Sequence, residues 1–369
     1  MKFSASKENL LEGVQVVQRA VSFNNPLPVL TGIKFTAGDG FLSLVATDLE
    51  IGAQCRIPAK VSEPGEVVLP GRYIIEVIKR LPDVNLLFTA DRLTGGARIG
   101  YGKSSIVLNG FPPGEFPEVD FTPGEIRFTV RDDNFKEAVR QVSFAAAQNY
   151  SNPVFTGVLI EISGAETTLV ASDMHRLAWR KLPLENAAGA SIKLLVPCKT
   201  LTELTRIIGA QGEEMLISVN GNRVLFTAGR ISFISRLIDG SFPQYSHVIP
   251  RTFSARVVIR TKELLEATER ASLLAGDGSP VIRLLIEKDL LAIKVSSEAG
   301  RVYEEVEVEH EGEQMLVAFN ARYLSDALKV VGTDKVVLEF GGPLSPAIIK
   351  PAGESRYFSL LLPVRLNES

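Results

Sequence analysis

The segment ASDMHRLAW, residues 171–179, holds the side chains of this 369-residue chain that are best suited to chemistry: Asp173, His175 and Arg176. Carboxylates and imidazoles are common general acids and bases, and a guanidinium binds phosphate or carboxylate groups. The trio therefore suggests a hydrolase or phosphodiesterase with a single site at His175 and Arg176. Such an enzyme also needs a nucleophile and base pair, metal ligands or a cofactor loop.

Two other segments argue against catalysis, because ATDLEIGAQ at residues 46–54 and VSSEAGRVY at residues 295–303 follow the same pattern. The acidic position recurs in all three segments, whereas His and Arg occur once. Asp173 is therefore predicted to end a strand and cap a turn. His247 and His310 lie at unrelated spacing, and the sequence has no HExxH, GxSxG or P-loop pattern. We expect no enzymatic activity, no metal and no cofactor, and the hydrolase stays as the alternative.

These segments belong to a threefold repeat. LSLVATD ends at Asp48, TTLVASD at Asp173 and LAIKVSSE at Glu298, so the steps are 125 and 125 residues. Upstream, PVLTGI, PVFTGV and PVIRLL begin at residues 28, 153 and 280. Downstream, three cations fall in register: Arg72, Lys199 and Arg322. The chain is three diverged copies of about 125 residues, each long enough for its own core.

Each copy reads as a short strand, an amphipathic helix, several strands, a second helix and closing strands. Short leading strands are expected at residues 2–4, 127–130 and 257–259. The helices are expected at residues 7–20, 71–81, 132–148, 198–208, 261–274 and 320–331. Turn-rich segments at 111–125 and 242–254 mark the boundaries and divide the chain into domains 1–122, 123–251 and 252–369. The predicted fold class is α+β, with two helices and mostly antiparallel strands per copy.

Charge is distributed unevenly along the chain. The six expected helices hold 13 Lys or Arg against 11 Asp or Glu, while the whole chain has a net charge of −3. The excess lies in the second helix of each copy, at Arg72, Lys79, Arg80, Lys199, Arg206, Arg322 and Lys329. Glu305, Glu307, Glu309 and Glu311 alternate as they would on one face of a strand. Charge alone is more typical of ordinary solvated faces and does not show DNA binding.

Apolar segments and cysteines indicate where the protein is located and which kinds of site it lacks. No apolar run is long enough for a membrane span or a signal peptide, so a cytoplasmic protein is expected. Cys55 and Cys198 indicate neither a metal site nor a disulfide framework. The glycines of the Thr94–Gly96 segment predict a hairpin turn.

The C-terminal segment 357–366, YFSLLLPVRL, is predicted to form a last core strand that Pro363 ends. Val364 and Leu366 lie beyond this strand, and apolar residues in such a place suggest the wall of a groove.

Taken together, the motifs resemble the bacterial beta sliding clamp family, the beta subunit of DNA polymerase III. The likeness runs from MKF at the start through LPVL, ATDLE, SDMHRLA, DGSFPQY and FNARYL to LLPVRL at residues 361–366. The resemblance implies a DNA polymerase processivity factor: three clamp domains per subunit and a head-to-tail homodimer that encircles duplex DNA. It implies helices that line the hole and strands outside. The implied partners are duplex DNA, which is bound whatever its sequence, the replicative polymerase, a clamp loader ATPase and other proteins with a clamp-binding motif.

The resemblance also implies a peptide-binding groove between the second and third domains. Its wall would be Phe155, Ser172, His175, Arg176, Leu177, Pro243, Val248, Leu344, Leu360, Leu362, Pro363, Val364, Arg365 and Leu366. Apolar anchors would pack inside, while Arg176 and Arg365 would stay at the rim. Met174, His247 and Pro346 differ from the residues common in the family, and Asn367–Ser369 extend past its usual end.

Further positions follow from the same resemblance. Arg72 matches a DNA contact of the family, and Asn149 keeps an amide where glutamine is usual. Asn24, Pro153 and Val154 do not keep the residue types of the other contact positions. The two ends of the subunit that meet in the dimer would carry Ile106 and Leu108 on one side and Leu273 and Leu274 on the other.

Overall fold

The computed structural model describes residues 1–90, 95–148, 152–186, 191–209, 211–276 and 280–365. The chain forms two compact units. The first comprises Met1–Asn134, Leu184–Ala188 and Lys199–Leu237, and the second comprises Phe135–Pro183, Gly189–Cys198 and Ile238–Ser369. Within the described ranges, no helix has both the length and the apolar character that crossing a bilayer requires.

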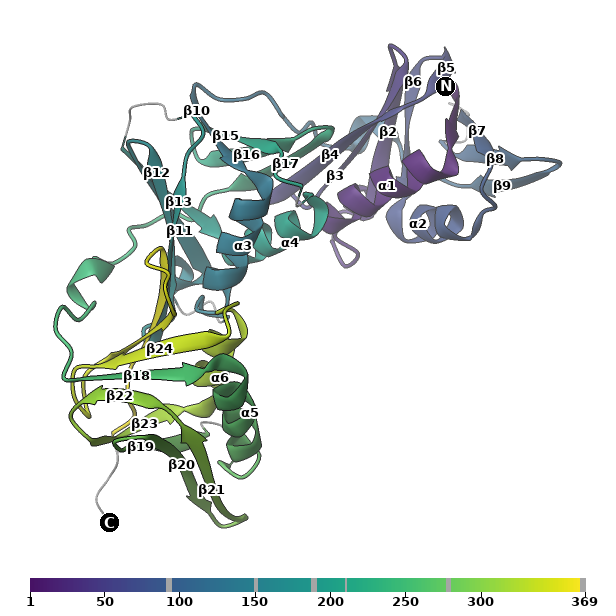
Figure 1. The fold of residues 1–369 in the computed structure, drawn as a ribbon. Helices are drawn as coiled ribbons and strands as arrows, with labels where there is room; N and C mark the ends of the chain where they lie inside the picture. The colour runs from purple at the N-terminus through teal and green to yellow at the C-terminus, as the bar shows by residue number, and fades with distance from the viewer. Residues whose placement is uncertain (91–94, 149–151, 187–190, 210, 277–279, 366–369) are drawn as a thin grey trace. The chain divides into compact units, whose positions relative to one another are not determined.

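Two antiparallel sheets build the first unit (Figure 1). The smaller has the order β5 (Lys60–Glu63), β1 (Lys2–Ser6), β7 (Asn85–Ala90), β8 (Ala97–Tyr101) and β9 (Ser104–Leu108). The larger has the order β10 (Ile126–Arg131), β15 (Glu214–Asn220), β16 (Arg223–Ala228), β17 (Ile231–Arg236), β4 (Ile51–Pro58), β3 (Phe41–Thr47), β2 (Gly32–Gly38) and β6 (Gly65–Pro70). Side chains alternate along the strands, so that Phe3 and Ala5 of β1 are buried and their neighbours are partly exposed.

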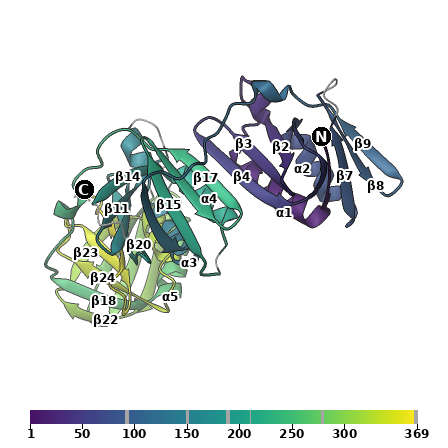
Figure 2. The ribbon, with the colours of Figure 1, turned by 90° about the horizontal axis from the view of Figure 1, so that it is seen from above.

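Among the described residues, the α-helices of the first unit are α1 (Lys7–Val17), α2 (Gly71–Arg80) and, from Lys199 on, α4 (Cys198–Ile207). Ser6 caps α1 by accepting a hydrogen bond from the Asn9 amide at 3.2 Å. Helices α1 and α2 lie next to one another in both views (Figure 1 and Figure 2). Helix α2 buries Ile74, Ile75 and Ile78 and leaves its cations exposed, which is the amphipathic pattern expected of a helix covering a sheet.

The second unit also holds two antiparallel sheets. The larger has the order β14 (Ile192–Pro197), β11 (Gly157–Ser163), β12 (Glu166–Ser172), β13 (Arg176–Pro183), β26 (Tyr357–Leu361), β25 (Ala347–Pro351), β24 (Lys335–Phe340), β18 (Ala255–Arg260) and β22 (Glu309–Gly312). The smaller has the order β21 (Gly300–Glu307), β20 (Leu290–Ser297), β19 (Val281–Ile286) and β23 (Met315–Asn320). Helices α5 (Thr261–Ser272) and α6 (Ala321–Lys329) lie side by side (Figure 1). They share one apolar core with strands of both sheets.

The predicted helices and leading strands are confirmed to within a few residues, with one larger difference. Helix α3 (Asp132–Ser143) ends well before the predicted residue 148. The apolar residues Ala145 and Ala146 prolong the helical period in the sequence, but they lie in a turn. The Ala147 amide donates to the Phe155 carbonyl at 2.8 Å, which draws the chain out of the helix.

The three repeats do not form three separate sets of sheets. Strands β10 and β15–β17 of the central repeat join β2–β4 and β6 of the first repeat, and β11–β14 join strands of the third repeat. The ladders that cross from repeat to repeat are β17 with β4 in the first unit and β13 with β26 in the second. We call these two ladders the first junction and the second junction. Both ladders are antiparallel. The strand β4 of the first repeat corresponds to β13 of the central repeat, and β17 of the central repeat corresponds to β26 of the third, so the same two kinds of strand meet at both junctions.

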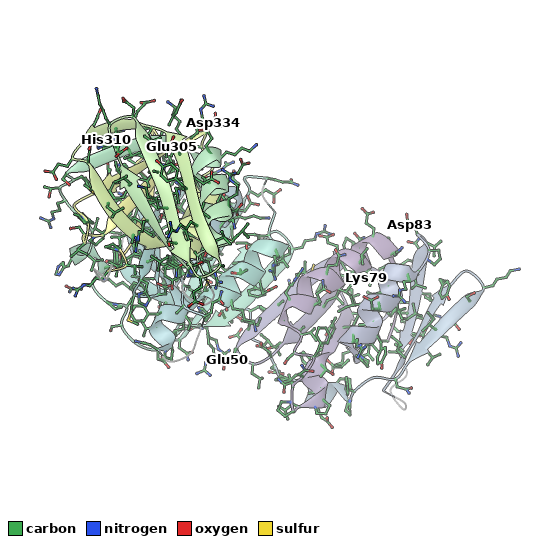
Figure 3. The ribbon with its side chains drawn as sticks, turned by 90° about the horizontal axis from the view of Figure 1, so that it is seen from below. Glu50, Lys79, Asp83, Glu305, His310 and Asp334 are labelled. Atoms are coloured by element: carbon green, nitrogen blue, oxygen red, sulfur yellow. The ribbon has the colours of Figure 1, made fainter. Side chains whose placement is uncertain are left out.

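The glutamate run does not lie on one strand, as the period of two had predicted. The strand breaks at Val308, so that Glu305 and Glu307 end β21 in one sheet, whereas Glu309 and Glu311 lie on β22 in the other. Figure 3 labels Glu305 and His310 on either side of this break. The Val308 amide donates to the Asp289 carbonyl at 3.2 Å and not to a ladder partner. All four glutamates are exposed.

Candidate functional site

The turn between β12 and β13 is held by its own side chains. Asp173 Oδ1 accepts hydrogen bonds from the amides of His175 and Arg176, each at 3.0 Å. Ser172 Oγ donates to the Arg176 carbonyl at 2.8 Å and accepts from the Met174 amide at 3.2 Å. Asp173 therefore caps the turn, as its recurrence in the repeats predicted. Ser172 Oγ is committed to the backbone and is poorly placed to act as a nucleophile.

Met174 adopts the left-handed backbone conformation, with φ of 75°. This conformation crowds the Cβ of any residue other than glycine, and it persists here because the surrounding bonds fix the turn. The Met174 side chain is 62% exposed. The turn thus presents a flexible thioether from a rigid backbone.

Arg176 is buried at the second junction, with 8% of the residue exposed. Its guanidinium forms ion pairs with Asp173 Oδ2 at 3.0 Å and Asp326 Oδ2 at 2.7 Å. It also lies over the Tyr323 ring, 4.3 Å from the ring centroid, and 5.4 Å from that of Phe144. The expectation that Arg176 stays at a solvated rim is therefore wrong. Two carboxylates and two rings satisfy this cation, so it supports the turn.

An apolar pocket of about 240 Å³ opens beside this turn. Its lining is Phe155, Ser172, Met174, Arg176, Leu177, Phe242, Pro243, Gln244, Tyr245, Val248, Leu360 and Leu362. Eight of these twelve residues belong to the predicted groove: Phe155, Ser172, Arg176, Leu177, Pro243, Val248, Leu360 and Leu362. Hence β13, β26 and the 242–248 segment bring together residues that are distant in sequence.

The floor of the pocket is rigid. Leu177 and Leu360 are buried in one cluster with Leu159, Val170, Leu195 and Ile348. The ring of Phe242 meets that of Phe155 edge to face at 6.0 Å. Tyr245 donates its hydroxyl hydrogen to Glu161, and burial together with this bond raises the pKa of Tyr245. The Tyr245 side chain is thus fixed as a neutral wall.

A more polar hollow of about 540 Å³ lies on the other side of Met174. Phe155, Met174 and Arg176 line both spaces. The remaining lining residues of the hollow are Ala146, Ala147, Gln148, Asn152, Asp173, His175, Arg322, Tyr323 and Asp326. His175, predicted for the groove, lies here with its ring stacked on Tyr323 at 6.3 Å.

The other predicted groove residues that the structure describes, Leu344, Pro363, Val364 and Arg365, lie outside both linings. Leu344 is 66% exposed. After β26, the Leu362 amide donates to the His175 carbonyl at 2.9 Å and the Val364 amide donates to the Ala318 carbonyl at 2.8 Å, so the segment is anchored beyond Pro363. Arg365 is exposed. Leu366 and Asn367–Ser369 lie outside the described residues, as does Thr94 of the expected hairpin turn.

Four lining residues were not predicted: Met174, Phe242, Gln244 and Tyr245. Three of them stand in the DGSFPQY motif, from which only Pro243 was assigned to the groove. The proline and aromatic residues of that motif were the available signal, since aromatic residues often line ligand sites.

The second helix of each repeat carries one exposed cation at the same position: Arg72, Lys199 and Arg322. Within the part of the chain that the structure describes, none of these three forms an ion pair. The later cations of the same helices are paired, for example Lys79 (labelled in Figure 3) with Glu76 at 3.1 Å and Lys329 with Glu269 at 3.0 Å. Among the described residues, one cation per repeat in these helices therefore lacks an ion pair. Asn149 lies outside the described residues.

The four predicted dimer residues differ in exposure. Ile106 and Leu108 lie on β9, the edge strand of the smaller sheet in the first unit, and are partly exposed. Leu273 is 81% exposed directly after α5. Leu274, in contrast, packs against the core of the third repeat.

The described residues hold no cluster of three or more His, Cys, Asp or Glu side chains suited to a metal ion. Neither the pocket nor the hollow contains an arrangement of nucleophile and base. The second junction thus places an apolar pocket next to a more polar hollow.

Comparison with known proteins identifies the class. The chain matches the family models of the DNA polymerase III beta subunit for the N-terminal domain at residues 1–120, the central domain at 129–244 and the C-terminal domain at 246–365. It is 34% identical to the beta sliding clamp of Bacillus subtilis over 99% of this chain and 100% of that protein. The Staphylococcus aureus clamp is also 34% identical, over 99% of each chain.

Solved structures agree. The Bacillus subtilis sliding clamp superposes with a TM-score of 0.95 at 33% identity over 100% of both chains. A Pseudomonas aeruginosa clamp bound to griselimycin gives a TM-score of 0.94 at 31% identity, over 99% of this chain and 100% of that one. These matches define a processivity factor of DNA replication, a sliding clamp with three α+β domains. The chain belongs to the DNA polymerase III beta subunit family.

Proposed function

We propose that two copies of this chain join head to tail into a ring that encircles duplex DNA. Closure in this way requires each subunit to present two different surfaces. Strand β9 is an edge of the smaller sheet in the first unit, and β21 is an edge of the smaller sheet in the second. Edge strands offer unpaired backbone groups to a neighbouring chain. Ile106 and Leu108 would flank one surface and Leu273 and Leu274 the other, with domains at 1–122, 123–251 and 252–369.

The ring would hold DNA by topology and touch its phosphates weakly. In the second helix of each repeat, Arg72, Lys199 and Arg322 lack an ion pair among the described residues, and the chain as a whole has a net charge of −3. So few contacts give a weak, salt-sensitive attraction that permits sliding. Among these residues, Arg72 is the proposed DNA contact, together with Asn149.

Partner proteins would dock in the apolar pocket at the second junction, and this pocket is the observation that carries the proposal. An extended peptide would place one or two large apolar side chains against Leu177, Val248 and Leu362, with polar groups toward the neighbouring hollow. The griselimycin complex of the Pseudomonas aeruginosa clamp supports a ligand site on such proteins. The proposed partners are the replicative polymerase, the clamp loader ATPase and other proteins with a clamp-binding motif.

The protein would act by tethering, without a catalytic step of its own. Ser172 Oγ and Arg176 are engaged in structural bonds, which leaves His175 without a nucleophile to activate. The hydrolase alternative thus gains no support from the described residues. The proposed location is the cytoplasm, where the bacterial chromosome is copied.

Titration of a fluorescein-labelled pentapeptide that ends in Leu-Phe tests the docking site. Leu362 is 38% exposed and lines the pocket, so Leu362→Arg would put a charge into the docking surface with little effect on folding. We expect a loss of about 30-fold or more in affinity, the size typical of an anchor contact. Leu316→Arg is the matched control, because Leu316 is 41% exposed and lies outside the pocket lining. Equal loss in both variants, or none in Leu362→Arg, would contradict the assignment.

A further inference from the structure

The four methionines of the chain differ sharply in exposure, and the structure describes all of them. Met1, Met215 and Met315 are buried, with 8% or less of each residue exposed. Met174 is 62% exposed. An oxidant in solution reaches a thioether sulfur more readily where the side chain is exposed, so Met174 is the methionine that it would modify first.

The two cysteines are less accessible than this thioether. Cys55 is buried, and Cys198 is half-buried with its Sγ donating to the Ser143 carbonyl at 3.5 Å. Met174 therefore presents the most exposed sulfur of the chain.

Met174 stands between the apolar pocket and the polar hollow, because it lines both spaces together with Phe155 and Arg176. Phe155 is buried and meets the Phe242 ring edge to face. Arg176 is buried and held by two ion pairs. Met174 is thus the exposed and flexible member of this shared wall. A chemical change at its sulfur would alter both spaces at once.

The backbone that carries Met174 is fixed by side chains of the turn. Ser172 Oγ accepts from the Met174 amide at 3.2 Å, and Asp173 Oδ1 accepts from the next two amides. At the first junction, the corresponding residue is Leu49, with φ of 79°, and Thr47 Oγ1 accepts from its amide at 3.0 Å. The same turn therefore accommodates a leucine, which has no sulfur to oxidise.

We propose that Met174 is an oxidative modification site that controls docking at the second junction, with a peroxide as the oxidant. A lone pair of the thioether sulfur attacks one oxygen of hydrogen peroxide, so that an S–O bond forms and the O–O bond breaks. The sulfur loses two electrons and the peroxide gains them. The departing hydroxide takes the proton of the transferred oxygen and leaves as water. Methionine sulfoxide reductases reverse the change.

The sulfoxide weakens docking because its oxygen needs a hydrogen-bond partner. Water supplies this partner while the site is empty, since Met174 is exposed. A peptide with an apolar side chain in the pocket excludes that water and offers the oxygen no replacement, which costs free energy. The modified protein therefore releases its partners until it is repaired. This inference rests on the proposed docking function of the second junction.

Titration of the fluorescein-labelled pentapeptide ending in Leu-Phe, before and after treatment with hydrogen peroxide, tests the proposal. The peptide contains neither methionine nor cysteine, and peroxide is removed by gel filtration before each titration. Mass spectrometry of proteolytic fragments measures the sulfoxide at each methionine, and circular dichroism checks folding. Met174 should gain one oxygen before the buried methionines do, and the Kd of the treated protein should rise by about 10-fold.

Two variants assign the effect, each judged by the ratio of its Kd after treatment to its Kd before. Met174→Leu should show no change, whatever its own Kd. Met215→Leu is the matched control, because Met215 is fully buried and lies outside both linings, and it should keep the wild-type ratio. A wild-type ratio in Met174→Leu would overturn the proposal, since another group would then cause the loss. If Met174→Leu does not fold, Met174→Gly takes its place, because glycine suits a φ of 75°.

Repair gives a second readout. Methionine sulfoxide reductases of both stereospecificities, supplied with dithiothreitol, should restore the affinity of treated wild type, whereas dithiothreitol alone should not. Full conversion of Met174 with an unchanged Kd, or earlier oxidation of the buried methionines, would overturn the modification site and leave the docking function intact. If untreated wild type binds no peptide, the docking function fails, and its control by Met174 fails with it.

Discussion

Arg176 Nη1 donates a hydrogen bond to Asp326 Oδ2 at 2.7 Å, and this contact joins a turn of the central repeat to helix α6 of the third. Removing the guanidinium would leave Asp173 and Asp326 without their shared cation in a largely buried place. We expect Arg176→Ala to lower the free energy of unfolding by about 3 kcal/mol or more. Urea denaturation followed by the fluorescence of Trp179, the single tryptophan, reports on the second unit.

Arg322→Ala is the matched control for this prediction. Arg322 lies on the same helix, is exposed and forms no ion pair within the described residues, so its loss should change stability by about 0.5 kcal/mol or less. Similar unfolding midpoints for the two variants would contradict a structural role for the buried arginine.

The chain end offers a graded test of the docking pocket. Deleting Leu362–Ser369 removes a pocket wall and the Val364 anchor, so affinity for the labelled pentapeptide should fall by about 30-fold or more. Deleting Asn367–Ser369 alone should leave affinity nearly unchanged, because these three residues follow the last apolar residue. Circular dichroism serves as the folding control. Unchanged affinity in the longer deletion would refute the pocket, and a large loss in the shorter one would give the tail a part in binding.

Most helices and leading strands could be predicted from the sequence, because the same pattern of elements occurs in each of the three repeats. Helices and leading strands fell within a few residues of their predicted bounds except where a non-local contact intervened. The Phe155 carbonyl ends the α3 turn, and Val308 interrupts the glutamate run. The periodicity of apolar and polar residues in the sequence shows neither the early end of α3 nor the break at Val308.

The candidate site was only partly predictable. Family likeness gave eight residues of the pocket, but it put Arg176 at the rim, since the pairing with Asp326 spans 150 residues of sequence. Tyr245 was missed because its role depends on Glu161, also far away in the chain. Burial and partners of a polar side chain arise from tertiary structure, which no local motif encodes.

We expect assembly to depend on Leu273. The family likeness predicts that polar residues at both Leu273 and Leu274 give folded monomers, but Leu274 packs into the core and its loss would also perturb the fold. Leu273→Ser alone should weaken dimerisation by about 30-fold, as loss of an interface anchor does. Sedimentation velocity across a dilution series measures this, with Leu316→Ser as an exposed-leucine control. A dimer as tight as wild type would rule out Leu273 as an interface anchor.

Stability at alkaline pH should depend on Cys55. Burial, with a smaller contribution from Glu12, raises the pKa of this thiol to about 11. An unfolded thiol ionises near pH 8.5 to 9, so the folded state binds the proton more tightly and loses stability as pH rises from about 9 to about 11. At 1.36 kcal/mol per unit, the loss approaches about 2 to 3 kcal/mol.

Cys55→Ala isolates this effect from the titration of other groups. The difference in unfolding free energy between wild type and Cys55→Ala should shrink by that amount between pH 9 and 11, as measured by urea denaturation at each pH. A difference that stays constant over this range would show that the thiol is not held protonated by the fold.

The central claim is that the protein holds DNA by encircling it. The protein would be loaded onto nicked circular DNA with a clamp loader and ATP, isolated by gel filtration at a salt concentration that abolishes its binding to short linear duplex, and then treated with a restriction enzyme that cuts the circle once. A ring predicts retention on the circle at that salt and release on linearisation, because the subunits slide off the ends. Loss from circles and short duplexes at the same salt, or retention after cutting, would contradict the account.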